Sequence, residues 1–406
     1  YMNQFNLLSP HYNSRQIYIQ STDYNRTLIS AYSNLAGMYY GSGRPDQDYP
    51  SDVDEWPQGW IPIPVHTVLN KYDYVGNPDA DCKRHSQMKD LLRSSTEYVD
   101  YKNQPQVKQT LDYLSEVTNS DVTFDNVYYL YDAMNCEDIH MVDLNGTGPN
   151  AQIDKWYPWY YTEDIPNIVA DIVDKNQDFQ NGLANPTGIN GIDVSFELPM
   201  MRAGETIHRI SDFLHGVLSC YRGSNGCVDY FKTLKYFGLS AHDKTVVSLM
   251  TLLGVKKYVI PMGWPEYAAS ALIELYVDNN YDEFFKVLYN YGNEDDGYKA
   301  ITSFVQGCPI TSQYCPLSVF DDLVKKYTPY PDMATVCDQD LPGFSSPTDS
   351  PSVTTTTPQG PQVSDDTSST LSTTTTTQKT TTTDSTSSTS IIFPFILSLL
   401  YSFREL

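Results

Sequence analysis

The sequence predicts a mixed α/β domain over residues 1–337, followed by a disordered Ser/Thr-rich tail. Short apolar segments of the strand type alternate with longer segments in which apolar residues recur at helical spacing, as in α/β folds. After Cys337 the composition changes sharply, and residues 345–390 contain 30 Ser or Thr in 46 positions. A segment with so few apolar residues cannot build a core, so we expect residues 338–390 to form a disordered, O-glycosylated stalk.

The first half of the domain opens with a strand and continues with helices. Apolar residues alternate over residues 16–20, and Thr22 or Asp23 is expected to cap the helix that follows. Residues 87–117 are predicted to be helical, in two pieces broken at Pro105. Two further helices are expected over residues 165–179 and 205–218.

The second half of the domain returns to strands. A strand is expected over residues 234–240, followed by a helix over 243–253 that Gly254 closes. Residues 271–277 and 284–290 flank a turn-forming Asp-Asn-Asn-Tyr segment, which predicts a pair of antiparallel strands.

The charge balance limits the partners. There are 50 acidic and 26 basic residues, so the formal net charge is −24. We exclude a nucleic-acid partner, because no broad basic face could neutralise a phosphate backbone. Most of the negative charge belongs to the domain rather than the tail, which suits a protein that works at low pH, although it equally serves solubility.

The seven cysteines favour disulfides over a metal site. No Cys-x-x-Cys pair occurs and no histidine lies at zinc-ligand spacing from the closer pairs. Cys220 with Cys227, and Cys308 with Cys315, enclose short loops that suit local disulfides. Asn145 lies in an Asn-Gly-Thr sequon that we place in a polar loop, so it is a glycosylation candidate. Together these features favour the secretory pathway, with an extracellular, cell-surface or lysosomal destination.

The two ends of the sequence carry expectations of their own. The chain starts at Tyr1 rather than Met, so we interpret it as a processed chain or fragment whose signal peptide would lie upstream. Residues 391–406 form an apolar anchor or anchor signal. Their length suits the removable tail of a lipid-anchor signal. A second interpretation is a short membrane span, and a third is that the segment is neither an anchor signal nor a span.

Two junctions between a strand and a helix carry candidate functional residues. Arg26 falls in the opening helical turn, where an Arg and the backbone N–H groups can bind an anion together. The alternative is a solvated or salt-bridged helix residue. At the second junction His242 could bind an anion and Asp243 could donate a proton. The alternative is that Asp243 is only the helix cap.

Two other histidines are weaker candidates. His66 lies in an apolar run and is expected to be a core residue rather than a catalyst. His85 follows Arg84, but that pair has no following Gly, has no second Arg nearby and begins a helix, so we do not assign it a catalytic role.

Four motifs in this order resemble the histidine acid phosphatases, most closely the prostatic and lysosomal type. They are Ser21-Thr-Asp-x-x-Arg26-Thr, Trp60-x-Pro62-Ile-Pro64-Val-His66-Thr, Ser240-Ala-His242-Asp243, and Gly307-Cys308 through Cys315-Pro316-Leu317. The resemblance spans most of residues 10–337. It implies a phosphoglycerate-mutase-like mixed sheet flanked by helices, with a smaller, mostly helical cap at roughly residues 75–205. It also implies hydrolysis of phosphate monoesters through a phosphohistidine, with no metal or other cofactor.

The resemblance also assigns roles to individual residues. Arg26 corresponds to a phosphate-clamping arginine, His242 to a phosphate-binding histidine, and Asp243 to the general acid that protonates the departing alcohol. Cys82 corresponds to the family cysteine that pairs with the last one, here Cys337.

The sequence departs from the family pattern in two places. Cys136 resembles a half-cystine whose usual partner position is Ser270 here, so Cys136 is expected to be the unpaired thiol. The nucleophile motif Arg-His-Gly-x-Arg-x-Pro, which the family carries on its first strand, does not occur. We therefore expect a domain that lacks its first strand, exposes a central sheet edge and is inactive as written.

The function expected from the sequence is that of an acid phosphatase acting on a small phosphorylated substrate. One alternative is a non-catalytic secreted or cell-surface protein on the same scaffold, and another is an inositol-phosphate phosphatase. Membrane attachment through the C-terminus and a homodimer are both left open.

Overall fold

The structure is a computed structural model. It describes residues 7–57, 59–138, 157–162, 164–185, 188–292 and 297–344, together with the backbone of 139–145 and 396–401. Within these ranges a single mixed sheet forms the centre of the molecule, in the strand order β2-β1-β3-β8-β4-β5-β6 with β7 paired to β5. The predicted α/β class is confirmed. The Ser/Thr-rich segment 345–390 and most of residues 391–406 lie outside the described residues.

One half of the sheet is parallel and the other half antiparallel. Strands β2, β1, β3 and β8 run parallel to one another, while β4 pairs antiparallel with β8 and with β5. The strands are β1 (Ile17–Thr22), β2 (His66–Val68), β3 (Tyr236–Ala241), β4 (Ser270–Val277), β5 (Glu283–Asn290), β6 (Lys299–Ala300), β7 (Cys315–Pro316) and β8 (Ile396–Tyr401).

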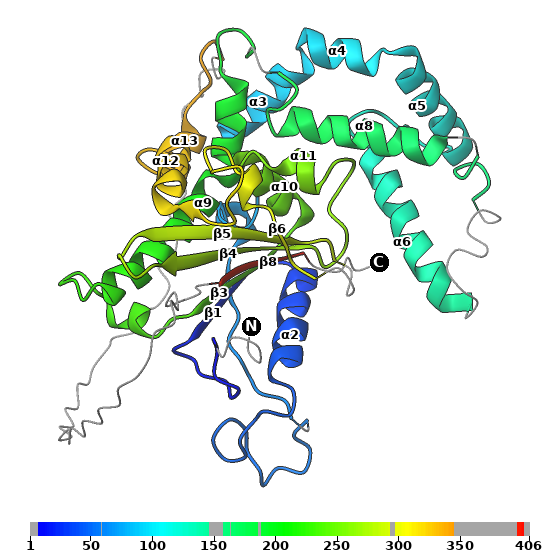
Figure 1. The fold of residues 1–406 in the computed structure, drawn as a ribbon. Coiled ribbons are helices and arrows are strands. Elements are labelled where there is room, and N and C mark those ends of the chain that lie inside the picture. The colour runs from blue at the N-terminus through cyan, green and yellow to red at the C-terminus, as the bar shows by residue number, and fades with distance from the viewer. Residues whose placement is uncertain are drawn as a thin grey trace, which may run out of the picture.

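Helices cover both faces of the sheet (Figure 1). The α-helices are α2 (Asn25–Tyr39), α3 (Lys83–Arg93), α4 (Thr96–Lys102), α5 (Pro105–Thr118), α6 (Val127–Asn145), α8 (Ile165–Gln180), α9 (Val194–Tyr221), α10 (Asp243–Leu252), α11 (Lys256–Val259), α12 (Leu317–Tyr327) and α13 (Met333–Asp338). Short 3-10 helices are η1 (Asn70–Tyr72), η2 (Asp229–Lys232) and η3 (Thr302–Phe304).

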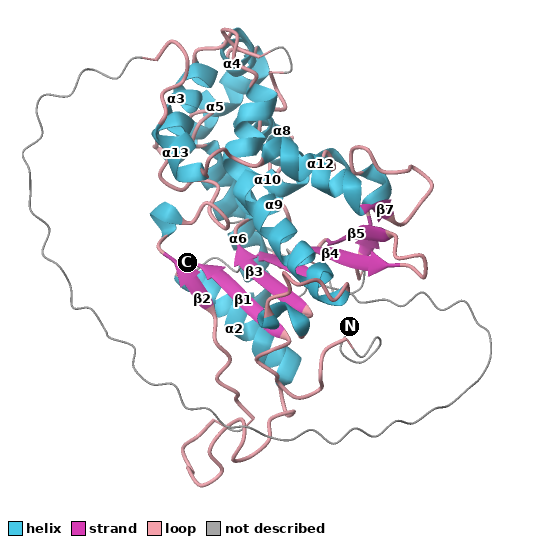
Figure 2. Ribbon diagram, turned by 90° about the vertical axis from the view of Figure 1, so that its left-hand side faces the viewer, coloured by secondary structure: helices cyan, strands magenta, loops and turns pink. Residues whose placement is uncertain are grey.

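Two apolar clusters form the core, one on each face of the sheet. The smaller lies under α2, where Leu35 packs with Ile17 and Ile19 of β1. The larger lies between the sheet and α9, α10 and α12, and extends into the helices α3 to α8. Those helices gather on the α9 side of the sheet, away from α2 (Figures 1 and 2). The sheet is therefore buried on both faces, as its near-continuous apolar strands require.

Several boundaries differ from the sequence expectation. Tyr24, with an extended backbone, is the cap residue of α2, so neither Thr22 nor Asp23 serves. The region expected as two helical pieces folds as the three helices α3, α4 and α5, because a break at residues 94–95 adds to the one before Pro105. Helix α9 starts eleven residues earlier than expected and contains Pro199 in its second turn.

The sheet has no open edge at the place where we expected one. The backbone of β8, from the apolar C-terminal segment, lies between β3 and β4. Tyr236 to Ala241 of β3 pair with Ile396 to Tyr401, so the hydrogen-bonding groups at the centre of the sheet are matched. None of the described helices is long and apolar enough to cross a membrane.

Candidate active site

A cleft opens where the parallel strands β1 and β3 end. Neighbouring parallel strands bring their carboxyl ends to one edge, and the helices α2 and α10 begin there (Figure 1). The cleft has a volume of about 650 Å³. Arg26, His242 and Asp243 all line it, so the structure brings together the three residues selected from the sequence. The remaining lining residues are Asp23, Tyr24, Asn25, Asn70, Asn77, Pro78, Asp79, Tyr128, Tyr129, Asp132 and Lys244.

Arg26 lies in the first turn of α2, directly after β1. Its Nη2 is 3.2 Å from Nδ1 of His242, 216 residues away in the sequence. The guanidinium also lies over the ring of Tyr24, 4.5 Å from the ring centroid. The positive end of the α2 dipole and the guanidinium therefore act on the same part of the cleft.

His242 is the cap residue of α10 and is almost completely buried. Its Nε2 lies 3.0 Å from Oγ1 of Thr22, and its ring meets the ring of Tyr24 edge-on at 5.0 Å. Burial is the main cause that lowers the pKa of His242 to about 3, and the positive charges of Arg26 and Lys244 contribute to the decrease while Asp79 opposes it. The imidazole is therefore neutral at pH 5.

Asp243 is the first residue of α10, so the cap of this helix is His242 and not Asp243. One carboxylate oxygen, Oδ1, accepts a hydrogen bond of 2.6 Å from the backbone N–H of Lys244. The side chain lines the same cleft as Arg26 and His242. This places a carboxyl group in the cleft together with a guanidinium and an imidazole, and a carboxyl group in such a position can serve as a general acid.

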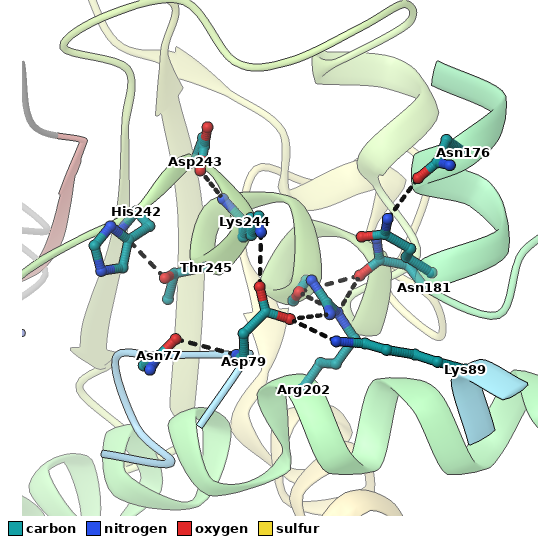
Figure 3. A network of polar contacts seen from close by, with 12 residues as sticks. Asn77, Asp79, Lys89, Asn176, Asn181, Arg202, His242, Asp243, Lys244 and Thr245 are labelled. Carbon is teal, nitrogen blue, oxygen red and sulfur yellow. Dashed lines mark hydrogen bonds and ion pairs between the residues drawn. The ribbon is translucent and has the colours of Figure 1, made fainter. Parts of the chain in front are cut away.

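A network of charged side chains adjoins the cleft through Asp79 and Lys244, which line it (Figure 3). Asp79 is at its centre, with Lys244 Nζ at 2.7 Å, Arg202 Nη1 at 3.3 Å and Lys89 Nζ at 3.4 Å. Burial acts to raise the pKa of Asp79, but these cations outweigh it and hold that pKa well below its usual range. Since one carboxylate faces three cations, the network carries excess positive charge next to the cleft.

The two weaker histidine candidates do not line the cleft. His66, expected in the core, is exposed on β2 and stacks on Tyr18 with ring centroids 4.6 Å apart, so that expectation is wrong. His85 is buried, and burial, reinforced by Lys89 and Arg202, lowers its pKa well below the usual range. Its neighbour Arg84 forms an ion pair with Glu197.

Sequence reasoning missed part of the lining of the cleft and its support. Asp79 lies in a loop with no periodic pattern, and Arg202 looks like any polar residue of a long helix. Lys244 had the best available signal, because it directly follows His242 and Asp243. The rings of Tyr128 and Tyr129 of α6 lie 4.0 Å apart between centroids, tilted by 33°, and nothing in their local sequence indicates that they reach the cleft.

The cysteines lie in the expected pairs. Bonded sulfur atoms join Cys82 to Cys337, Cys220 to Cys227 and Cys308 to Cys315. Cys136 is a free thiol whose Sγ lies 2.9 Å from the hydroxyl oxygen of Tyr267. Three disulfides fit a protein of the secretory pathway.

The loop expected around Asn145 is not observed, because Asn145 is the last residue of α6. As a separate observation, the described side chains include no group of three or more His, Cys, Asp or Glu that could hold a metal ion.

Comparison with known proteins identifies the family. The model of the histidine phosphatase superfamily (branch 2) matches residues 1–290. The chain belongs to this family. It is 30% identical over 352 residues to "Putative acid phosphatase 10" of Caenorhabditis elegans, covering 83% of this chain and 80% of the relative. Prostatic acid phosphatase of Rattus norvegicus is 28% identical over 335 residues, covering 81% of this chain and 74% of that protein.

A solved structure, Hafnia alvei phytase in complex with tartrate, aligns with 83% of this chain and 84% of its own at 13% identity and a TM-score of 0.47. The family and the acid phosphatase relatives support hydrolysis of phosphate monoesters, and therefore a small phosphorylated substrate, as the chemistry of this scaffold.

Proposed function

We propose that the cleft binds the phosphate of a monoester between Arg26 and His242, and that Asp243 protonates the departing alcohol. The observation that carries the proposal is the 3.2 Å contact between Arg26 and His242, at the point where two helices begin. A guanidinium and oriented N–H groups supply the donors that the phosphoryl oxygens require. Asp243 lines the same cleft, within reach of a leaving group that points outward.

Besides a phosphate-binding site and a proton donor, the reaction requires a nucleophile. The phosphohistidine mechanism needs a histidine flanked by arginines, and no Arg-His-Gly-x-Arg-x-Pro motif occurs in residues 1–406. We therefore expect these 406 residues to bind phosphate but not to turn over a substrate. A chain extended at its N-terminus by such a segment is expected to be active.

The acidic lining bears on the substrate. Asp23 and Asp132 line the same cleft, so a substrate that carries several phosphates meets carboxylates around the proposed anion site. A monoester with a neutral or aromatic leaving group avoids that repulsion and can contact Tyr128 and Tyr129.

The setting of the enzyme is part of the proposal. Three disulfides and the Asn145 sequon support a secreted glycoprotein at the cell surface or in lysosomes. Residues 396–401 pair within the sheet as β8, so membrane attachment through the apolar residues after position 390 would require this strand to leave the sheet. Exposed Tyr32, Tyr40 and Trp60 surround a hollow of about 210 Å³ and offer a surface for a homodimer.

The first experiment measures anion binding by calorimetry at about pH 5. Arg26→Ala removes charge-assisted hydrogen bonds and is expected to weaken phosphate binding by about 10- to 100-fold. Arg26→Lys keeps the charge but not the planar fork, so it should recover only part of the loss. The matched control is Arg15→Ala, an exposed arginine before the opposite end of β1. Equal affinity in all four proteins would contradict the proposed site.

The second experiment measures turnover of p-nitrophenyl phosphate by the N-terminally extended chain at about pH 5. Asp243→Asn in that chain is expected to lower kcat by about 100-fold or more while phosphate binding persists, because only the proton donor is lost. If the extended wild-type chain hydrolyses no p-nitrophenyl phosphate, the assignment as an acid phosphatase is contradicted.

A further inference from the structure

Hydrogen bonds behind the cleft determine which ring nitrogen of His242 carries the proton. The chain of bonds starts at Thr27, whose Oγ1 lies 2.9 Å from the carbonyl oxygens of both Thr22 and Tyr24. A carbonyl oxygen can only accept, so the Thr27 hydroxyl hydrogen points at one of these two oxygens. Thr27 Oγ1 also lies 2.9 Å from Thr22 Oγ1. Since Thr27 has no second hydrogen, Thr22 donates in that bond.

The next bond connects Thr22 to His242. Thr22 has donated its only hydrogen to Thr27, so its Oγ1 accepts from Nε2 of His242 at 3.0 Å. Nε2 therefore carries a hydrogen. The contact at the other ring nitrogen indicates the same tautomer independently. Arg26 Nη2 lies 3.2 Å from Nδ1, and an arginine side chain can only donate. Nδ1 is therefore an acceptor with a bare lone pair.

This tautomer is unsuited to binding an anion. Nδ1 is the ring nitrogen on the Arg26 side, and its lone pair would repel a phosphate or sulfate oxygen. Turning the hydroxyls around would leave Thr27 Oγ1 against two carbonyl oxygens with no hydrogen between them, which is unfavourable in a buried position. The remaining way for Nδ1 to donate to an anion is to gain a proton.

We propose that Thr22 and Thr27 are positioning residues that hold His242 in the Nε2–H form, so that an anion bound between Arg26 and His242 is accompanied by uptake of one proton at Nδ1. The proposal rests on the proposed function, since it takes this cleft as the phosphate site. The proton comes from solvent and no other bond is made or broken.

The charges around His242 are consistent with this linkage. Arg26 of α2 and Lys244 of α10 oppose a positive imidazole, while Asp79 favours it. Asp243, together with Asp23 and Asp132 elsewhere in the lining, adds carboxyl groups to the surroundings. A bound anion adds negative charge at Nδ1 and attracts Arg26 away from the ring, and both changes favour the imidazolium. Binding that takes up a proton strengthens as the pH falls.

Sulfate is a suitable probe, because it does not itself take up a proton near neutral or mildly acidic pH. Calorimetry of the full chain at about pH 5, in two buffers with different ionisation enthalpies, counts the protons taken up with each sulfate. We expect between about half and one proton, and an affinity that falls by up to about tenfold per pH unit between about pH 5 and 7. In ¹⁵N spectra of the free protein, His242 should show a protonated Nε2 and an unprotonated Nδ1.

Variants at position 22 separate positioning from packing. Thr22→Val keeps the shape but removes the acceptor of Nε2–H, so the neutral ring can carry its hydrogen on Nδ1 and donate to sulfate without a proton. Sulfate affinity should then vary less than about threefold over the same pH range. Thr22→Ser keeps the hydroxyl and should restore the wild-type pH dependence, and His242→Gln should remove the proton uptake.

The outcomes distinguish this proposal from the proposed function. Sulfate binding without proton uptake, or an unchanged pH dependence in Thr22→Val, would overturn the proton linkage and leave the phosphate site standing. The opposite tautomer in the ¹⁵N spectra would overturn the positioning role of Thr22. Absence of sulfate binding at every pH would overturn both the phosphate site and the linkage.

Discussion

Asp79 shows how a single carboxylate can organise a positive site in an acidic protein. It lies between the Lys244 ammonium at the cleft and the guanidinium of Arg202, which is completely buried in α9. Nε of Arg202 also donates to Asn181 and Ser248, so these two side chains and Asp79 contact its buried guanidinium. The molecule has a net charge of −24, yet its cleft is adjacent to a cluster in which cations outnumber carboxylates. An anionic substrate is thereby attracted locally.

A substitution at this position tests the network. Asp79→Asn leaves the buried Arg202 without its counter-ion, and we expect the free energy of unfolding to fall by about 3–5 kcal/mol. Urea denaturation at pH 7 measures the change. Asp229→Asn is the matched control, because it breaks the exposed pair with Lys232 and should leave the free energy of unfolding nearly unchanged.

The pH dependence of the same variant follows from the pKa of Asp79. The folded pKa lies well below the unfolded value of about 3.9, so the stabilisation by Asp79 is present above that value and is lost as the pH falls below it. The difference between wild type and Asp79→Asn should therefore be the same at pH 7 and pH 5, and shrink near pH 3. A difference that already disappears at pH 5 would contradict the assignment.

Among the elements, the long helix α9 connects the site to the rest of the fold. It carries Arg202 beneath the cleft and packs against both α10 and α12. The approach to α12 is close at Gly204, where a Cβ atom would lie 2.3 Å from the carbonyl oxygen of Tyr327. Glycine is needed here because any side chain would collide with backbone, which cannot rotate away.

Two glycine substitutions test this contact. Gly204→Ala should destabilise the protein by about 1–3 kcal/mol, because α9 and α12 must separate to admit a methyl group. Gly37→Ala is the matched control in α2, where nothing lies within 4 Å of the added Cβ. That exposed helical position should gain about 0.5–1 kcal/mol. Both changes remove one glycine, so the difference between their thermal unfolding midpoints isolates the clash.

For the whole molecule, the disulfide between Cys82 and Cys337 connects the start of the helical region to the end of the domain. The two cysteines are 255 residues apart in the sequence, and they join the residue before α3 to α13. Arg84 and Gln87 of α3 reinforce this junction through hydrogen bonds to Asp340. The start of the helical region and helix α13 are thereby held together.

Removing this disulfide should cost more than removing a local one. The chain-entropy model gives about 5 kcal/mol for a loop as long as that of Cys82–Cys337 and about 2 kcal/mol for a loop as short as that of Cys220–Cys227. Paired Cys→Ser variants of each bond, compared by urea denaturation, measure the two costs. Equal losses would show that loop closure does not account for the stabilisation.

Much of the fold could be predicted because its signals are local. The alternation in β1, the helical spacing in α8 and the Gly254 that ends α10 with a positive φ are all local features of the sequence. Other features depend on contacts that no local pattern encodes. The three-helix division of residues 83–118 and the placement of β8 between β3 and β4 both follow from packing and pairing at a distance.

The candidate site divides in the same way. Short-range periodicity and motif order were enough to predict that Arg26, His242 and Asp243 follow directly after strands. The structure was needed to show that β1 and β3 are neighbours, that Arg26 contacts Nδ1 of His242, and that Thr22, next to Thr27, contacts the other ring nitrogen. It also placed Asp79, Lys89 and Arg202 at one point. The physical reason is that hydrogen bonds and ion pairs act over a few ångströms in space, whereas these residues are separated by up to 220 positions in the chain.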